Sequence, residues 1–288
     1  MSIEAVLQTL SGIPPLTGIP RDQIRVSSLG GLTNTNVKLD TPAGVFVLQM
    51  PSIDPIGTRD HARTIEATRM AASLGIGAGV AYADTATGMI VTRWIDASPM
   101  SAERFHSEPD KLREAAHLLR CLHRSDSRFG RRFDPFDAIR RYAASVTTSP
   151  CSPRLDAAVK SAETVQAEPA PIHGDPVPEN FLGSPDGLRL VDWEYAGIGD
   201  PAWDLAYLSL EADFAPSDEE RLLAAYGDPL LTMERLHVSK MVAATLAGRW
   251  GTLRAQRHLP PDLSAWTRTR LRQAEAMSAS LYPTAGSG

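Results

Sequence analysis

The hydrophobic pattern of this chain changes once, close to residue 95, and this change limits the folds that the chain can adopt. Before that point, short runs of alternating apolar and polar residues predict antiparallel strands with one helix among them. The predicted strands are three runs within residues 24–50 and two more at residues 79–83 and 89–95, and the helix covers residues 60–74. Turns at Gly30–Gly31 and at residues 41–44 separate the first three strands.

After that point, apolar residues recur at helical spacing. Helices are predicted over residues 109–125, 135–146, 154–167, 201–212, 217–226, 232–257 and 264–281. The signals at Ser217 and Glu220 indicate a capping box. A β-hairpin with its turn at residues 184–187 interrupts the helices. The sequence therefore predicts an α+β protein with a β-rich lobe over residues 1–95 and a larger helical lobe over residues 96–288.

Composition limits the partners and the location of the chain. The formal net charge of −5 argues against nucleic acid as the main partner, because phosphate backbones attract basic surfaces. No apolar run reaches the roughly 18 residues of a membrane span, and the first ten residues lack the basic segment of a signal peptide. The two cysteines, Cys121 and Cys151, are too few for a disulfide framework. We therefore expect a cytoplasmic protein without a membrane partner, with Cys121 as a buried free thiol.

The stretch PIHGDPVPENFL, residues 171–182, combines acidic and amide side chains with three prolines. The prolines disfavour a long helix, because proline lacks a backbone donor and clashes with the preceding turn. Asp175 and Asn180 are therefore expected on a stiff loop. The predicted hairpin then brings Asn180 and Asp192 to neighbouring strand ends. Their amide and carboxylate oxygens are ligands that suit Mg²⁺.

His173, Asp175 and Asn180 fit the pattern H-x-D-x4-N, which phosphoryl-transfer enzymes combine with a later metal-binding aspartate. By itself this pattern also suits a surface turn with incidental acids. The turn at Gly30–Gly31 has two interpretations as well: it lets backbone amides approach phosphate oxygens, or it only reverses the chain. The hairpin that ends in Asp192 favours phosphoryl transfer from ATP.

Four stretches together resemble the choline/ethanolamine kinase and aminoglycoside phosphotransferase superfamily, whose members have a two-lobed, protein-kinase-like fold. They are GGLTNTNVKL at residues 30–39, LRCLHRS at 119–125, HGDPVPENFL at 173–182 and LVDWEYAGIGDPAWDLA at 190–206. Within the superfamily, they are most similar to bacterial choline kinases. The last two stretches are specific, and the resemblance covers about residues 24–212.

The resemblance implies a role for each matching residue. Asp175 would be the catalytic base, and Asn180 and Asp192 would hold Mg²⁺. Asp204 would tie the catalytic loop to the following helix, whereas Asp200, which precedes a proline, suits a helix N-cap. The cofactor ATP would be covered by the glycine turn and the adjoining strands, with Gly30, Gly31, Thr33, Asn34, Asn36, Lys38 and Gln49 as binding residues.

Position 49 departs from the family pattern. Members usually carry a lysine or arginine here, which contacts the ATP phosphates and pairs with a glutamate of the following helix. This chain has Gln49, and Thr64 stands where the glutamate is expected. Glu66 points elsewhere, because two helical residues turn by about 200°. Either another cation serves, with Lys38, Arg59 and Arg63 as the candidates, or the protein is a catalytically impaired nucleotide-binding protein.

The expected acceptor is a small amino alcohol such as choline or ethanolamine. Aromatic faces and acids recognise organic cations, and the candidate residues are Trp193, Glu194, Tyr195, Trp203, Glu211 and Trp250. Each aromatic residue taken alone suits the core better, but as a set beside a catalytic loop they favour a small organic cation. An aminoglycoside or other antibiotic is the alternative acceptor, but residues 232–288 contain eight Arg or Lys against three acids. The sequence leaves the acceptor and the oligomeric state open.

Overall fold

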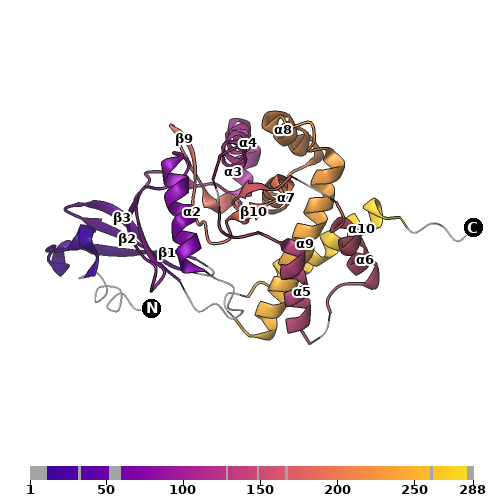
Figure 1. Cartoon of the computed structure of the whole chain (residues 1–288), viewed down its shortest axis with the longest axis horizontal. Coiled ribbons are helices and arrows are strands. Elements are labelled where there is room, and N and C mark those ends of the chain that lie inside the picture. Colours follow the sequence, from indigo (N-terminus) through magenta and orange to yellow (C-terminus); the bar gives the residue numbers. More distant parts are fainter. Residues whose placement is uncertain are drawn as a thin grey trace, which may run out of the picture. The chain divides into compact units, whose positions relative to one another are not determined.

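The computed structural model describes residues 12–31, 34–51, 60–127, 129–147, 149–165, 168–259 and 262–283 (Figure 1). Contacts divide the chain into two compact units, of which the first combines Met1–Pro99 with Asn180–Ala196 and the second combines Met100–Glu179 with Gly197–Gly288. We expected one boundary near residue 95, but the contacts group residues 180–196 with the N-terminal elements. The assignment of nucleotide binding to residues 1–95 and of acceptor binding to residues 96–288 stays a prediction.

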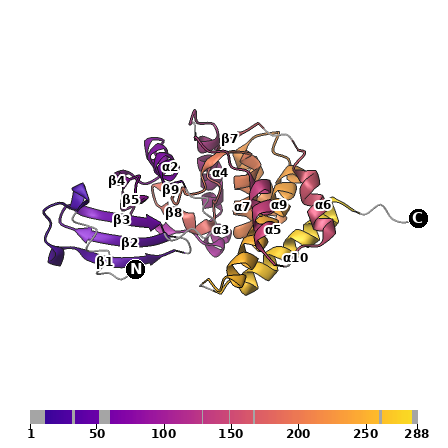
Figure 2. The same ribbon diagram turned by 60° about the horizontal axis from the view of Figure 1, so that its bottom comes forward.

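The first unit contains a five-stranded antiparallel sheet (Figure 2). Its strands, in spatial order, are β1 (Arg25–Gly30), β2 (Asn34–Thr41), β3 (Gly44–Pro51), β5 (Met89–Arg93) and β4 (Val80–Asp84). Helix α2 (His61–Ser73) begins after Asp60, whose side chain caps it by accepting from the amide of Arg63 at 3.2 Å. The predicted strands and helix of this unit are therefore confirmed.

The two faces of this sheet differ, because alternate residues of a strand point to opposite faces. The apolar face forms a buried core from Val37, Leu39, Phe46, Leu48 and Met50, together with Ile13 and Leu16 from the short 3-10 turn Pro14–Leu16 and the residue before it. The intervening residues share the other face, and the polar ones among them are Asn34, Asn36 and Lys38 on β2 and Gln49 on β3. Asn36 is the register partner of Gln49.

A second sheet of the first unit carries part of the predicted site. Its strands, in spatial order, are β6 (Ser98–Pro99), β8 (Phe181–Ser184) and β9 (Gly187–Leu190). β8 and β9 form the predicted hairpin, with Phe181 opposite Leu190. The amide of Leu190 also donates to the carbonyl oxygen of Ile76 at 2.7 Å. The hairpin is therefore bonded to the segment that follows α2.

The second unit is mostly helical. Its helices are α3 (Ala102–Ser107), α4 (Pro109–His123), α5 (Pro135–Ser145), α6 (Pro153–Ala162), α7 (Pro201–Glu211), α8 (Pro216–Tyr226), α9 (Met233–Gln256) and α10 (Ser264–Leu281). β7 (Ala170–Ile172) and β10 (Gly197–Gly199) form a small antiparallel sheet. Helix α9 contacts both α7 and α10 and contributes Met241, Ala243 and Ala244 to the core (Figure 2). In the described part of the chain, no helix has both the length and the hydropathy needed to cross a bilayer.

Five helices of this unit, α4 to α8, have proline at their first position. Proline suits this position because the amide it lacks would have no partner inside the helix. The predicted starts of these helices accordingly lie within one residue of the observed ones. The predicted capping box at Ser217 and Glu220 is wrong, because α8 begins at Pro216 and the carboxylate of Asp218 accepts from the amide of Ala215 at 3.1 Å.

Cys121 is exposed, so the prediction of a buried thiol is wrong. The buried face of α4 contains Leu112, Ala115, Ala116, Leu119 and Leu122. Cys121 belongs instead to an exposed stripe at helical spacing, which consists of Asp110, Arg113, His117 and Cys121. The apolar neighbours of Cys121 in sequence therefore do not predict its burial.

Candidate active site

The loop after β7 carries Asp175, and hydrogen bonds fix the backbone on both sides of this residue. The carboxylate of Asp204 accepts from the amide of His173 at 2.7 Å and from the amide of Gly174 at 2.9 Å. Gly174 has a φ of 85°, a conformation that glycine adopts without strain. The indole nitrogen of Trp203 donates to the carbonyl oxygen of Gly174 at 2.9 Å. The loop is thus bonded to helix α7, as predicted for Asp204.

His173 is buried and serves the loop itself. Its Nδ1 accepts from the amide of Asp175 at 3.3 Å. Because Nδ1 is an acceptor, the neutral ring carries its proton on Nε2. Asp175 is half-buried. The backbone amide of Val177 donates to the backbone carbonyl oxygen of Asp175 at 2.9 Å. His173 therefore supports the loop through a hydrogen bond to its own backbone.

A buried chain of hydrogen-bonded side chains extends from Asp204 through His123 to Tyr226. His123, at the end of α4, places Nε2 at 3.0 Å from Oδ2 of Asp204 and Nδ1 at 2.9 Å from the hydroxyl of Tyr226. The carboxylate of Asp204 accepts a hydrogen bond from Nε2 of His123. Nδ1 of the same ring is then the acceptor of a hydrogen bond from the hydroxyl of Tyr226. Burial raises the pKa of Tyr226 to about 12, with a further contribution from Asp228 and Asp204. The tyrosine therefore stays protonated as the donor.

Asp200 caps helix α7, as predicted. Its carboxylate accepts from the amide of Ala202 at 2.9 Å, and Pro201 follows it at the first helical position. Arg235 of α9 donates to the same oxygen of Asp200 at 2.6 Å. The two aspartates of the segment 200–204 therefore have different partners, because Asp200 fixes the helix start and Asp204 fixes the loop.

Asn180 and Asp192 lie at neighbouring strand ends of the β8–β9 hairpin. The amide of Val191 donates to the carbonyl oxygen of Asn180 at 3.0 Å, one residue before Asp192. Asp192 has a φ of 65°, which is uncommon for a residue other than glycine. An amide oxygen and a carboxylate fit Mg²⁺, which binds proteins through one or two such side chains plus substrate phosphates.

The predicted glycine turn lies between β1 and β2. Gly31 has a φ of 135°, and a Cβ atom there would lie 2.5 Å from the carbonyl oxygen of Asn34. A side chain at position 31 would therefore clash with the backbone, which explains why glycine stands there. Asn34 and Asn36 follow the turn on β2. Thr33 lies outside the described residues.

Two side-chain amides, one from β2 and one from β3, donate to Asp192, the predicted metal ligand, and sequence reasoning missed this contact. Nε2 of Gln49 lies 3.1 Å from Oδ1 of Asp192, and Nδ2 of Asn34 lies 3.4 Å from the same atom. Nδ2 of Asn34 also lies 3.3 Å from Oε2 of Glu194, which is buried. The uncharged residue at position 49 is therefore bonded to Asp192 directly.

Lys38 has an ion pair and an aromatic contact of its own. Its ammonium lies 3.2 Å from Oδ1 of Asp40 and 4.6 Å from the ring centroid of Trp94. Its role as a substitute cation stays a prediction, and so does that of Arg63, which pairs with Asp60 at 2.8 Å. Arg59 lies outside the described residues.

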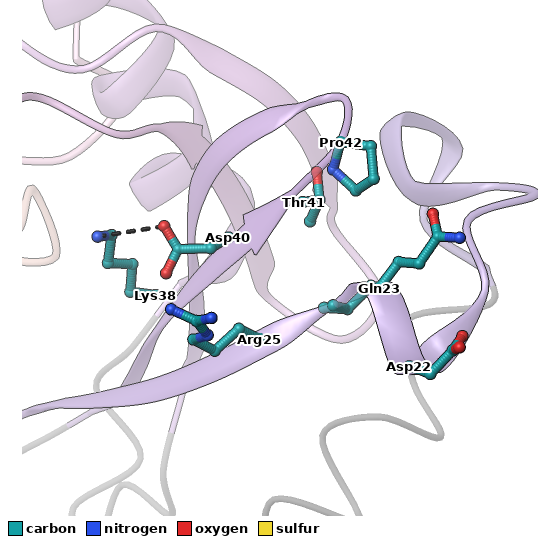
Figure 3. Close-up of a pocket in the computed structure, with 8 residues that line it drawn as sticks. Asp22, Gln23, Arg25, Lys38, Asp40, Thr41 and Pro42 are labelled. Carbon is teal, nitrogen blue, oxygen red and sulfur yellow. Dashed lines mark ion pairs between the residues drawn. The ribbon is translucent and has the colours of Figure 1, made fainter.

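Lys38 also lines an open hollow of about 700 Å³ on the first unit, together with Asp22, Gln23, Ile24, Arg25, Asp40, Thr41 and Pro42. In Figure 3, the ion pair of Lys38 with Asp40 lies on one side of this hollow and Asp22 and Gln23 on the other. Asp40 is six residues from Asn34 along β2, or about 20 Å at 3.3 Å per residue. The hollow therefore lies at the opposite end of β2 from the glycine turn.

Helix α2 lacks a glutamate at the position where the family pattern expects one. The hydroxyl of Thr64 donates to the carbonyl oxygen of Asp60 at 3.2 Å, within its own helix. Glu66 is exposed on α2, and the buried residues of that helix are Ile65, Ala67, Thr68 and Ala71. Thr64 and Glu66 thus differ in exposure as the two-residue shift predicts.

Three of the candidate acceptor residues are buried within the fold. Trp193 is 2% exposed, and its indole nitrogen donates to the carbonyl oxygen of Leu190 at 3.2 Å. Trp203 is 3% exposed and stacks on Tyr207 with ring centroids 5.5 Å apart. Glu194 is the third, and Tyr195 is half-buried. The acceptor roles of these residues stay predictions.

Glu211 and Trp250 belong to a charged aromatic cluster at the ends of α7, α9 and α10. Glu211 accepts from Arg270 at 2.7 and 3.0 Å and from the indole nitrogen of Trp266 at 3.3 Å. Trp250 lies edge-on to Trp266 with ring centroids 5.9 Å apart, and the guanidinium of Arg254 lies 4.9 Å from the Trp250 centroid. Both side chains thus already have cationic neighbours within their own unit.

Comparison with known proteins adds a family and three relatives. A family model described as the phosphotransferase enzyme family matches residues 26–237. Protein LicA of Haemophilus influenzae is 29% identical over 212 residues, which cover 70% of this chain and 62% of that protein. The chain thus spans about three fifths of the length of this relative.

Two solved structures resemble the chain over nearly its whole length. A choline/ethanolamine kinase family protein from Mesorhizobium loti is 30% identical with a TM-score of 0.83, and the match covers 96% of this chain and 95% of that one. The choline kinase LicA from Streptococcus pneumoniae is 25% identical with a TM-score of 0.81, over 96% of this chain and 98% of that one. The expected α+β, protein-kinase-like fold is therefore confirmed.

Proposed function

The chain belongs to the phosphotransferase enzyme family, and from this premise we propose that it transfers the γ-phosphate of ATP to the hydroxyl of a small amino alcohol such as choline or ethanolamine. As a member, it is a small-molecule kinase. The observation that carries the choice of acceptor is the similarity to a choline/ethanolamine kinase family protein at 30% identity over 96% of this chain. The basic composition of residues 232–288 also disfavours a polycationic aminoglycoside, because like charges repel.

Asp175 is the proposed catalytic base. Its loop supports this role, because a base must be held within hydrogen-bond reach of the proton that it accepts. The bonds from His173 and Gly174 to Asp204, and from Trp203 to Gly174, restrain the backbone on the N-terminal side of Asp175. Asp175 would accept the proton of the acceptor hydroxyl and orient its oxygen towards the phosphate.

Asn180 and Asp192 are the proposed holders of Mg²⁺. When bound, Mg²⁺ neutralises negative charge on the phosphates that leave and transfer. Asp192 would contribute a carboxylate and Asn180 an amide oxygen, from the two neighbouring ends of the β8–β9 hairpin. The turn at Gly31, with Asn34 and Asn36 after it, would cover the phosphates of ATP.

The test is a panel of acceptors with ATP and Mg²⁺, read out as ADP release and as phosphorylated product by mass spectrometry. The panel contains choline, ethanolamine, thiamine, homoserine and an aminoglycoside. We expect choline or ethanolamine to give the highest kcat/KM. Faster turnover of the aminoglycoside would replace the proposed acceptor class. Nucleotide binding without turnover of any acceptor would instead favour the impaired-kinase alternative.

A further inference from the structure

Two side-chain amides from the five-stranded sheet converge on one oxygen of Asp192. Nε2 of Gln49, on β3, donates to Oδ1 at 3.1 Å, and Nδ2 of Asn34, on β2, approaches it at 3.4 Å. Asp192 follows β9, which belongs to the other sheet of the same unit. Asn34 and Gln49, which we call the amide clamp, therefore fix the carboxylate from a second element.

Asn34 extends the clamp to a second acid. Its Nδ2 also lies 3.3 Å from Oε2 of Glu194, and an amide nitrogen has two protons to share between two carboxylates. Glu194 is 6% exposed, so this contact lies inside the unit. The segment from Asp192 to Glu194 is thus bonded to β2 at both acids.

The backbone of Asp192 explains why such restraint matters. Its φ of 65° lies in a region that residues other than glycine rarely adopt, and such conformations persist where the surroundings impose them. The hydrogen bond from Gln49 to the carboxylate of Asp192 restrains the direction in which this carboxylate points. Gln49 itself is held by β3, opposite Asn36 of β2.

The charge of the clamp is its second property. Both donors are neutral amides, so they orient the carboxylate without neutralising it. A lysine at position 49 would form an ion pair with Asp192 and compete with any other cation for the same oxygen. The neutral clamp therefore adds no positive charge beside Asp192 that would oppose a metal ion.

We propose that Asn34 and Gln49 are positioning residues that hold Asp192 in place for a divalent cation without adding a positive charge of their own. The proposal rests on the proposed function for the identity of the metal ligand. The proposal also gives a reason for Gln49 in place of the family's basic residue. The chain lacks a side-chain cation at this position, and in return Asp192 binds the metal ion more strongly. In this positioning role the clamp acts through Asp192.

The hydrogen bond is tested by a double-mutant cycle on the unfolding of the nucleotide-free protein in urea. The variants are Gln49→Met, which keeps the length of the side chain without its donor, Asp192→Ala, and both together. We expect the double variant to lose less stability than the sum of the single losses, because the second change removes a bond already broken. Additive losses would overturn the clamp.

The charge argument is tested with Mn²⁺ alone, titrated into the nucleotide-free protein and followed by electron paramagnetic resonance. Gln49→Lys should weaken Mn²⁺ binding by about tenfold or more, since a unit charge close to the ligand opposes the cation. Gln23→Lys is the matched control, because Gln23 is exposed beside the hollow at the other end of β2. It adds the same charge and should change binding by less than about twofold, owing to screening by salt.

The outcomes separate this inference from the proposed function. Coupling of Gln49 with Asp192 and weaker Mn²⁺ binding in Gln49→Lys would support the inference even if no acceptor on the panel were phosphorylated. ADP release with choline, together with an additive cycle, would overturn the clamp and keep the function. Equal Mn²⁺ binding by the wild type, Gln49→Lys and Gln23→Lys, or no Mn²⁺ binding by the wild type, would overturn the role towards metal.

Discussion

His123 and Asp204 form a fully buried pair, with Nε2 of the imidazole 3.0 Å from Oδ2 of the carboxylate. The same carboxylate accepts hydrogen bonds from the backbone amides of His173 and Gly174. The side chain of Asp204 therefore connects the end of α4 to the loop that carries Asp175. Tyr226 donates to the other nitrogen of His123 at 2.9 Å. Three helices of the second unit, α4, α7 and α8, thus contribute to the position of this loop.

Asp204→Asn should destabilise the protein and slow its reaction. The amide keeps the size of the carboxylate, but its NH₂ group faces a backbone or imidazole donor, and a buried unsatisfied donor costs about 1–3 kcal/mol of unfolding free energy. Urea unfolding and kcat for ADP release measure the two effects. Asp200→Asn is the control on the same helix, because asparagine caps a helix as well as aspartate does. Equal stability of the two variants would contradict the role given to Asp204.

The pH dependence of stability should report Tyr226. Its pKa is raised to about 12 from an ordinary value of 10.0, chiefly by burial. Between these values the folded protein keeps a proton that the unfolded chain has lost, so the free energy of unfolding falls as the pH rises through this window. Tyr226→Phe should flatten that part of the curve and should cost about 1 kcal/mol at lower pH, where the bond to His123 is lost. Urea unfolding across the window tests this, and parallel curves for both proteins would refute it.

Asp175→Asn should leave the fold and ATP binding nearly intact and lower turnover by roughly 10²-fold or more, the usual contribution of a general base. The backbone bonds of the loop come from His173, Gly174 and Val177 and do not need the carboxylate. Steady-state ADP release gives kcat, and calorimetry gives ATP affinity. Wild-type turnover in the variant would remove Asp175 from the mechanism.

Asp192→Ala should weaken the binding of ATP with Mg²⁺ more than Asn180→Ala does. A carboxylate neutralises the charge of a metal ion, whereas an amide oxygen only coordinates it. Calorimetric titration of each variant with ATP, with and without Mg²⁺, separates loss of metal from loss of nucleotide. The opposite ranking would mean that the metal ligands are misassigned.

Gln49→Arg combined with Thr64→Glu should lower the KM for ATP by about fivefold, because hydrogen bonds to charged groups contribute more than those between neutral groups. Gln49→Arg alone should help less. The structure gives a reason, since the side chain at position 49 already reaches Oδ1 of Asp192 at 3.1 Å and a lone cation there would pair with it. Initial rates against ATP concentration test the pair, and an unchanged KM in the double variant would refute it.

The larger elements were predictable from the sequence because their signals are local. The β1–β2 and β8–β9 hairpins follow from alternating residues around glycine turns, and proline marks the starts of helices α4 to α8. The elements that were missed are short: α3, β6, β7 and β10 have two to six residues. The three short strands are formed by pairing with distant parts of the chain, for example Ser98 of β6 with Gly183 of β8.

The candidate site divides in the same way. The loop from His173 to Asn180 is contiguous, so its pattern could be recognised from residue types and spacing. The contacts of Asp192 with Gln49 and Asn34 join residues 143 and 158 positions apart, and no single sequence reports them. His123 was within reach, since it lies in the stretch LRCLHRS that resembled the family. Its partner Tyr226, 103 positions away, carried no signal.

The grouping of residues 180–196 with the N-terminal sheet has a consequence for how this chain can be divided. The polypeptide passes between the two units three times, after Pro99, Glu179 and Ala196. A fragment that ends at Pro99 would lack the strand β8 that pairs with β6, and it would lack both Asn180 and Asp192. Neither unit is therefore a portable module: exchange with a relative at the junction after Pro99 or after Glu179 would separate the amide clamp from the carboxylate that it holds.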